Sequence, residues 1–136
     1  MAEIIGVAAG LLSLSIQIVD TAKKLKARFA AIKGLPETID KVERNLEFLG
    51  FFLSRVEEQS SYPTSTAAPD YEILLKYCLA DYNAICDGLR RLERRLEKMM
   101  AKGPFWGLQV RKSGALVTEI QSLDQMERRA YQHITL

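Results

Sequence analysis

The chain has 136 residues, of which 48% are hydrophobic and 26% are charged. This size and balance are typical of one soluble globular domain and exclude collagen-like, low-complexity and wholly disordered proteins. The net charge of +2 is too small to indicate a nucleic-acid partner, and two cysteines with one histidine are too few for a structural zinc site.

The chain opens with an apolar run: residues 4–19, IIGVAAGLLSLSIQIV, contain no charged side chain. The start Met-Ala-Glu has no basic region and no cleavage-site pattern follows the run, so a secretory signal is not indicated. A membrane-spanning helix needs about 20 apolar residues, whereas this run is shorter and includes Ser13, Ser15 and Gln17. Its composition therefore lies between that of a buried core helix and that of a membrane-active one.

Gly6 and Gly10 form a GxxxG motif within this run. Small residues at that spacing let helices approach closely in lipid. In a soluble bundle, the same residues would let the first helix pack tightly on its neighbours. Each glycine costs a helix interior about 1 kcal/mol relative to alanine, so we expect a packing or functional reason for both.

The rest of the chain predicts helices, because no period-two alternation persists and turn signals are widely spaced. The first helix is predicted from near Ala2 to Ile32 or Lys33, with Gly34 ending it and Pro36 in the first turn of the second helix. The second helix carries an apolar stripe at spacings of three and four. Its members are Ile39, Val42, Leu46, Leu49, Leu53 and Val56, widened by Phe48, Phe51 and Phe52.

Residues 60–69 predict a surface loop, after which Asp70 can cap a third helix. The apolar positions of that helix alternate steps of four and three, as in a coiled-coil seam. They are Tyr71, Leu75, Cys78, Tyr82, Ile85, Leu89, Leu92, Leu96 and Met99. Gly103 and Pro104 end this helix. Because Cys78 and Cys86 lie about 12 Å apart along it, a disulfide between them is excluded.

A connection with Phe105, Trp106 and Leu108 leads to a fourth helix. The inward face of that helix is predicted to hold Leu116, Ile120, Leu123, Met126, Ala130 and Ile134. We therefore predict an all-α fold, an antiparallel four-helix bundle with room for one extra short helix. Residues 1–136 are expected to form a single helical N-terminal domain of a longer multidomain protein.

No enzymatic constellation is predicted, and we expect no catalytic residues, cofactor or metal. His133, near the end of the chain, is interpreted as an exposed terminal side chain. The run that holds Glu37, Asp40 and Glu47 is interpreted as a solvated helix face with local ion pairs. Gly6 and Gly10 do not follow a strand, so no phosphate-binding loop is indicated.

The charges are unevenly distributed. Lys23, Lys24, Lys26 and Arg28 follow the apolar run directly, which is the arrangement that attraction to anionic lipid requires. Residues 89–112 hold eight basic side chains against two acidic ones. For residues 89–102 alone we favour a solubilising helix face, because glutamates stand at helical spacing from the arginines. No aromatic residues interleave this run, so nucleic acid is not an expected partner.

The opening residues 1–26, MAEIIGVAAGLLSLSIQIVDTAKKLK, resemble the start of the fungal HeLo, HeLo-like and SesA-like domains. These domains form the N-termini of STAND receptors (NACHT or NB-ARC, NLR-like) and of related cell-death effectors. The matching pieces are residues 5–10 with their two glycines, 20–26, the Leu-Pro-Glu turn at 35–39, and Phe105-Trp106 before the last helix.

The resemblance implies a cell-death execution domain that rests in the cytoplasm as a bundle. On homo-oligomerisation, driven by an attached or partner NLR-like receptor, its N-terminal helix would be freed and would permeabilise the plasma membrane. The candidate membrane-inserting residues are Ile4, Ile5, Gly6, Val7, Gly10, Leu11, Leu12, Leu14 and Ile16, and the candidate anionic-lipid ligands are Lys23, Lys24, Lys26 and Arg28. Together with Ile18 and Val19, the large side chains of this set are too apolar to be fully covered along a helix that also exposes its lysine-rich half. The alternative is a non-lytic adaptor that relays the receptor's signal through protein contacts, with the first helix as permanent core.

Overall fold

The computed structural model describes residues 2–30, 32, 34–60, 71–103 and 114–135, apart from the side chains of 2–5, 56, 57, 59, 60, 71, 72, 115 and 135. Nearly all of the described residues belong to four helices: α1 (Ala2–Arg28), α2 (Leu35–Ser60), α3 (Tyr71–Met100) and α5 (Gly114–Thr135). No strand occurs in these ranges, and the predicted all-α bundle is confirmed. The Asp70 cap, the Phe105-Trp106 connection and any extra short helix there lie outside the described residues.

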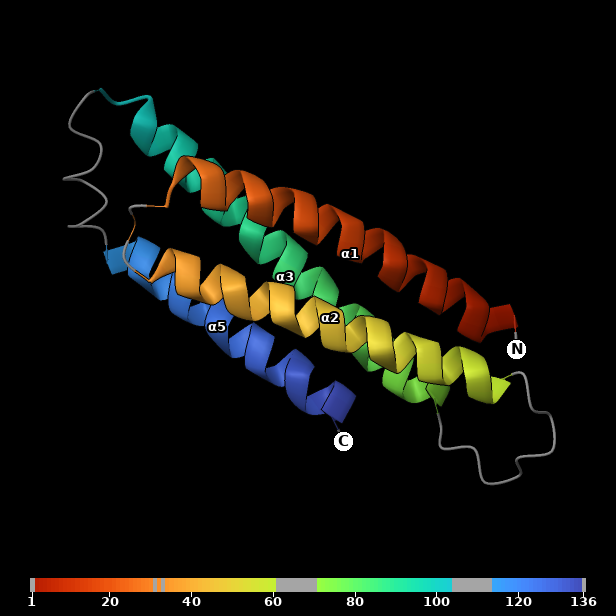
Figure 1. Cartoon of the computed structure of the whole chain (residues 1–136). Coiled ribbons are helices and arrows are strands. Elements are labelled where there is room, and N and C mark those ends of the chain that lie inside the picture. Colours follow the sequence, from red (N-terminus) through yellow and green to blue (C-terminus); the bar gives the residue numbers. More distant parts are fainter. Residues whose placement is uncertain (1, 31, 33, 61–70, 104–113, 136) are drawn as a thin grey trace.

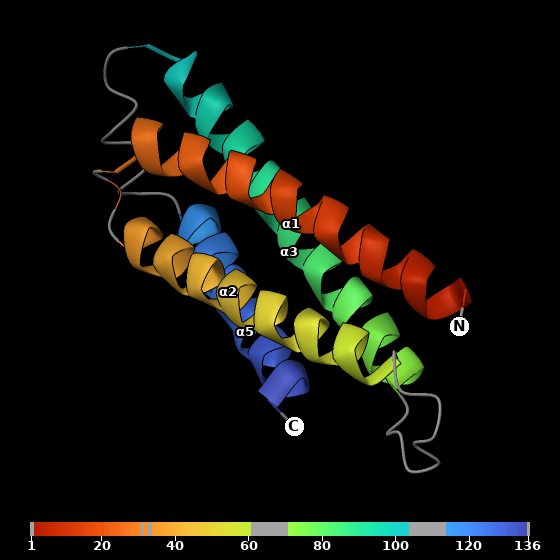
Figure 2. The same ribbon diagram turned by 45° about the vertical axis from the view of Figure 1, so that its right-hand side comes forward.

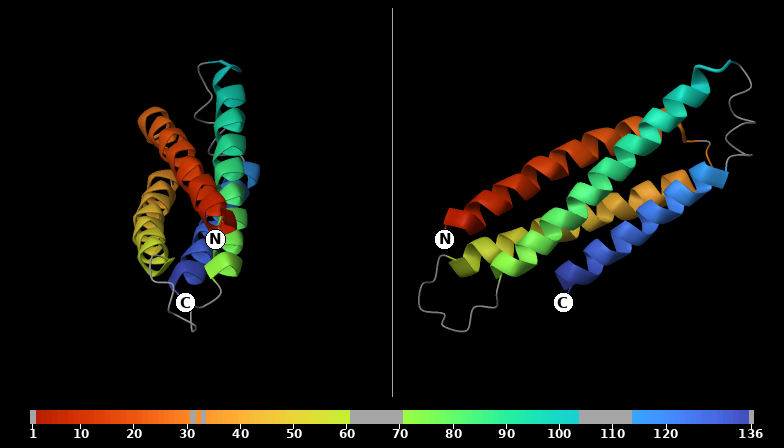
Figure 3. Two further views of the ribbon diagram at one scale, coloured as in Figure 1. Left: turned by 90° about the vertical axis from the view of Figure 1, so that its right-hand side faces the viewer. Right: turned by 180° about the vertical axis from the view of Figure 1, so that it is seen from behind.

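Successive helices run in opposite directions along the bundle (Figure 1). α1 packs on α3 and α2, and α5 packs on the same two helices, so the order around the bundle is α1, α2, α5, α3. The parallel neighbours α1 and α3 lie side by side on one side of the bundle, and α2 and α5 on the other (Figure 2). The C-terminal halves of α1 and α3 therefore meet at one end of the molecule, and their N-termini lie at the other (Figure 3).

The apolar stripes meet in a continuous core. In α3 every described member of the predicted seam from Leu75 to Leu96 is buried, and Met99 packs against the core partly buried. The predicted inward face of α5 is also confirmed, with Met126 and Ile134 at its partly buried edge. The expectation that Phe48 and Phe51 widen the α2 stripe is wrong: both are exposed, and the Phe48 ring packs edge-on against Tyr131 at 5.4 Å.

The end of α1 differs from the prediction. The helix ends at Arg28, and the buried Phe29 begins a turn in which its carbonyl accepts the Ile32 N–H at 3.1 Å. Gly34 has a φ of 87°, a conformation that side chains disfavour. Its carbonyl accepts the Thr38 N–H at 3.2 Å, which starts α2. Gly34 therefore lies in the turn that leads into α2, and the buried Phe29 and Ile32 belong to that turn and not to α1.

A buried polar network joins three of the helices. The Asn45 side-chain amide on α2 donates to the Glu127 carbonyl of α5 at 2.8 Å and to its carboxylate at 3.3 Å. The Tyr82 hydroxyl on α3 donates to the Asn45 side-chain oxygen. Burial raises the pKa of both Tyr82 and Glu127. The network fixes α2, α3 and α5 in register, since breaking it would leave buried polar atoms without partners.

The raised pKa of Glu127 predicts a pH-dependent contribution to stability. Because the folded chain holds this proton more tightly than the unfolded chain, the contribution is fully present below the ordinary pKa of 4.5 and is lost as the pH rises through the raised value. Glu127→Gln keeps an oxygen for Asn45 but removes the titration. We expect urea unfolding at a series of pH values to show a shallower decline in stability for the variant. Equal slopes in both proteins would contradict this assignment.

Candidate functional site: the N-terminal helix

The helix α1 presents apolar side chains on two different faces. Leu11 and Ile18 are fully buried against the bundle, whereas Leu12 and Ile16 are 55% and 65% exposed. Leu12 and Ile16 stand four residues apart, so they lie on one side of the helix. The exposed Ala9 lies three residues before Leu12 and therefore on the same side. We call residues 9, 12 and 16 the outer stripe. The expectation that the apolar run exceeds what the bundle can cover is confirmed at Leu12 and Ile16.

Two of the remaining candidate insertion residues lie at the edge of the core. Val7 and Leu14 are partly buried and pack against the core. The side chains of Ile4 and Ile5 lie outside the described residues. Within the described part of the chain, no helix is both long and apolar enough to cross a membrane.

The two glycines of the GxxxG motif are not needed for packing in the bundle. A Cβ added at Gly6 would meet nothing within 4 Å, and one at Gly10 would lie at an ordinary 3.7 Å from Leu79 Cδ1. The expectation that they bring the first helix close to its neighbours in the folded chain is therefore wrong. Both positions carry the helix cost of glycine without a compensating contact in this structure.

The basic half of α1 is partly engaged in ion pairs. Lys26 pairs with Asp40 of α2 at 2.7 Å and Arg28 with Glu97 of α3 at 3.0 Å, all four side chains being nearly half exposed. The hydrogen bond from Lys26 to Asp40, followed by the charges of Asp40 and Glu43, raises the pKa of Lys26. Lys23 and Lys24 are exposed and pair with no described residue. Exposed ion pairs contribute at most about 1 kcal/mol, so anionic headgroups can compete for all four bases.

The attachments of α1 differ from those that join the other helices. Among the described residues, its polar links to the other helices are exposed: the Lys26 and Arg28 pairs, a 3.8 Å contact from Arg28 to the Met100 sulfur, and a 2.6 Å hydrogen bond from Arg90 to the Gln17 side chain. In the described part of the chain, the buried polar network does not include α1. Apolar packing, chiefly on α3, therefore holds α1 in place.

The residues considered for other chemistry have structural roles. The prediction of an exposed, terminal His133 is wrong: it is partly buried, pairs with Asp81 and stacks at a tilt on Tyr77, because α5 continues to Thr135 alongside α3.

The ion pairs of Asp40 and Lys41 join different helices. Asp40 pairs with Lys26 and Lys41 pairs with Asp124, whereas pairs within α2 were expected. Among the described side chains, no group of three or more histidine, cysteine or acidic residues is arranged to hold a metal ion.

Comparisons with protein-family models, with curated proteins and with solved structures gave no match. The class of the protein is therefore defined from its own structure. The molecule is an all-α four-helix bundle whose first helix carries an exposed apolar stripe, followed about two turns later by the exposed Lys23 and Lys24.

Proposed function

We propose that this domain targets membranes and executes cell death, resting in the cytoplasm as the closed bundle. On homo-oligomerisation, driven by an attached or partner NLR-like receptor, the N-terminal half of α1 leaves the bundle and permeabilises the plasma membrane. The observation that carries the proposal is the outer stripe, where Leu12 and Ile16 are exposed on a helix that no buried polar bond among the described residues ties to the others.

The distribution of buried side chains along α1 favours partial release. Burial of a Leu, Ile or Phe side chain contributes about 1.5–3 kcal/mol. Between residues 6 and 17 only Leu11 is fully buried, whereas Ile18, Ala22 and Leu25 all are in the second half. Detaching the first half therefore costs a fraction of what detaching the whole helix would. Apolar contacts with lipid or with other copies of the chain can offset this smaller free-energy cost.

The released segment is suited to the membrane interface. Residues 4–19 span about 24 Å as a helix, less than the hydrocarbon core of about 30 Å, so partial insertion with local thinning is expected. Gly6 and Gly10 would then pack helix against helix. Lys23 and Lys24 would bind anionic headgroups at about 1 kcal/mol each. Lys26 and Arg28 would also bind headgroups, once lipid phosphates replace their carboxylate partners.

A second candidate function is a non-lytic adaptor. Ile18, Ala22 and Leu25 are all buried, which favours the second half of α1 as permanent core. In this alternative the exposed side chains of the bundle contact the receptor and its signalling partners, and α1 never leaves α3.

Dye leakage from vesicles of phosphatidylcholine and phosphatidylserine separates the two functions. The full chain is tested as it stands and with a C-terminal tetrameric coiled coil that forces oligomerisation. We expect the tetramer to release dye from anionic vesicles and to spare neutral ones. An oligomer that stays folded and releases no dye would contradict membrane execution and favour the adaptor. Deleting residues 1–19 is a poor control, because it removes Leu11 and Ile18 from the core.

A further inference from the structure

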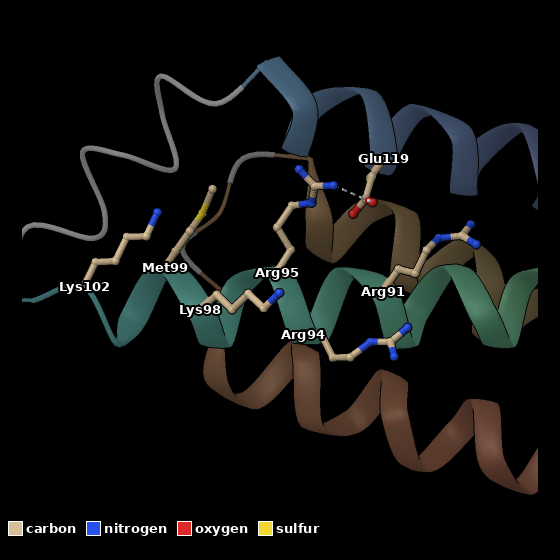
Figure 4. A pocket seen from close by; sticks show the side chains of 7 residues that line it. All are labelled: Arg91, Arg94, Arg95, Lys98, Met99, Lys102 and Glu119. Atoms are coloured by element: carbon tan, nitrogen blue, oxygen red, sulfur yellow. Dashed lines mark ion pairs between the residues drawn. The ribbon is translucent and has the colours of Figure 1, made fainter.

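The C-terminal half of α3 and the first turns of α5 border an open hollow of about 530 Å³ (Figure 4). We call it the basic hollow. It is lined by Arg91, Arg94, Arg95, Lys98, Met99, Lys102 and Glu119. The five basic residues recur at helical spacings of three and four, which places them along one side of α3.

Little in the described structure neutralises these charges. Arg95 pairs with one oxygen of Glu119 at 3.3 Å, and the other oxygen, Oε2, is buried without a hydrogen-bond partner among the described residues. Arg91, Arg94, Lys98 and Lys102 form no ion pair with a described residue. Five basic side chains and one acidic side chain therefore line the hollow.

Two ordinary explanations for the basic cluster are insufficient. The first is local pairing with glutamates of the same helix, which the sequence favoured. Glu97 instead pairs with Arg28 of α1, and no ion pair joins Glu93 to a described residue. The second is compensation of the helix dipole, which acts only within the last turn. It accounts for Lys98 but not for Arg91 and Arg94, which lie one to two turns farther from the helix end at Met100.

We propose that the basic hollow binds a compact group that carries several phosphates. The four cations on α3, from Arg91 to Lys98, extend over about 10 Å of helix, and Lys102 follows two residues after the helix ends. The volume of the hollow is in the range of small-molecule sites. Guanidinium forks bind phosphate oxygens in pairs, and lysines add point charges. Two sources share this chemistry: the headgroup of a multiply phosphorylated inositol lipid, and a soluble inositol polyphosphate.

This inference does not rest on the proposed function, because ligand binding here requires no movement of α1. It identifies a second anion site, distinct from Lys23 and Lys24, near the same end of the bundle (Figure 3). A ligand in the hollow would bring that end of the molecule to a phosphate-rich surface whether or not α1 is released.

The test uses the full chain with two probes. Isothermal titration calorimetry with inositol hexakisphosphate measures the soluble source, and co-sedimentation with phosphatidylcholine vesicles containing 5% phosphatidylinositol bisphosphate measures the lipid source. The hollow variant is Arg91→Gln, Arg94→Gln, Lys98→Gln, which leaves the Arg95–Glu119 pair intact. The control variant is Arg44→Gln, Arg55→Gln, Arg129→Gln, which removes the same charge from other exposed positions.

For whichever probe binds, we expect the hollow variant to lose at least tenfold in affinity and the control variant to stay within twofold of the native chain. Binding of the soluble probe would show that a free polyphosphate is sufficient as the ligand of the hollow. Binding only of the vesicles identifies the lipid headgroup. Equal losses in both variants would show attraction by net charge alone and would overturn the proposal, as would an absence of binding to either probe.

Discussion

Replacing Leu12 and Ile16 together by glutamine is expected to lower vesicle leakage by the oligomerised chain at least tenfold while leaving the fold intact. Both side chains are more than half exposed in the bundle, so their loss changes little in the core. In the membrane, each apolar side chain contributes about 1.5–3 kcal/mol of transfer free energy. Losing both would reduce partitioning about a hundredfold or more.

The matched control is Phe51→Gln with Val117→Gln, which removes two exposed apolar side chains from α2 and α5. Leakage by this variant should remain near that of the native chain, and circular dichroism and urea unfolding should show both variants folded. Equal losses of leakage in the two variants would indicate that general surface apolarity, and not the outer stripe, drives membrane attack.

Replacing Gly6 and Gly10 together by alanine is expected to move stability and leakage in opposite directions. Neither added Cβ meets a clash in the bundle, so the free energy of unfolding should rise by about 1–2 kcal/mol through helix propensity. In the membrane the two methyl groups would hold neighbouring helices apart where the glycines let them touch. Leakage should therefore fall several-fold in a more stable protein.

Gly50→Ala on α2 is the control for this pair, since a Cβ there also meets nothing within 4 Å. It should stabilise the bundle by a similar amount per residue and leave leakage unchanged. Unaltered leakage in the Gly6→Ala, Gly10→Ala variant would remove helix packing through the GxxxG motif from the mechanism.

Most of the bundle follows from hydrophobic periodicity. The regular four-and-three spacing of the α3 seam predicts its buried face correctly, because a helix that packs on several neighbours must bury such a stripe. The end of α1 and the exposure of Phe48 and Phe51 are not predicted, since both depend on which helix lies next to which. The partner of His133 is missed for the same reason: Asp81 lies on another helix.

The candidate site is predictable in composition but not in geometry. An excess of apolar residues in the first helix is visible from the sequence, whereas the choice of Leu12 and Ile16 as the exposed pair follows from the packing of α1 chiefly on α3. The basic hollow depends on tertiary structure in the same way. Glu97 stands beside arginines of its own helix in the sequence, but the neighbouring α1 supplies its partner, Arg28.

Release of α1 from α3 is the central claim, and distances between spin labels test it most directly. One label pair at the exposed Ala9→Cys and Asn83→Cys reports on α1 and α3, and a second at Asn83→Cys and Gln125→Cys reports on α3 and α5. The native cysteines are buried, and burial raises the pKa of Cys78 to about 12, so these thiols should not take up the label. Labelled protein is diluted with unlabelled chain, so that each measured distance lies within one molecule.

In solution both distances should be narrowly distributed. On anionic vesicles that leak, we predict that the α1–α3 distance lengthens and broadens while the α3–α5 distance is unchanged. An unchanged α1–α3 distance on leaking vesicles would contradict the account, because the membrane would then be attacked by a bundle that never opens.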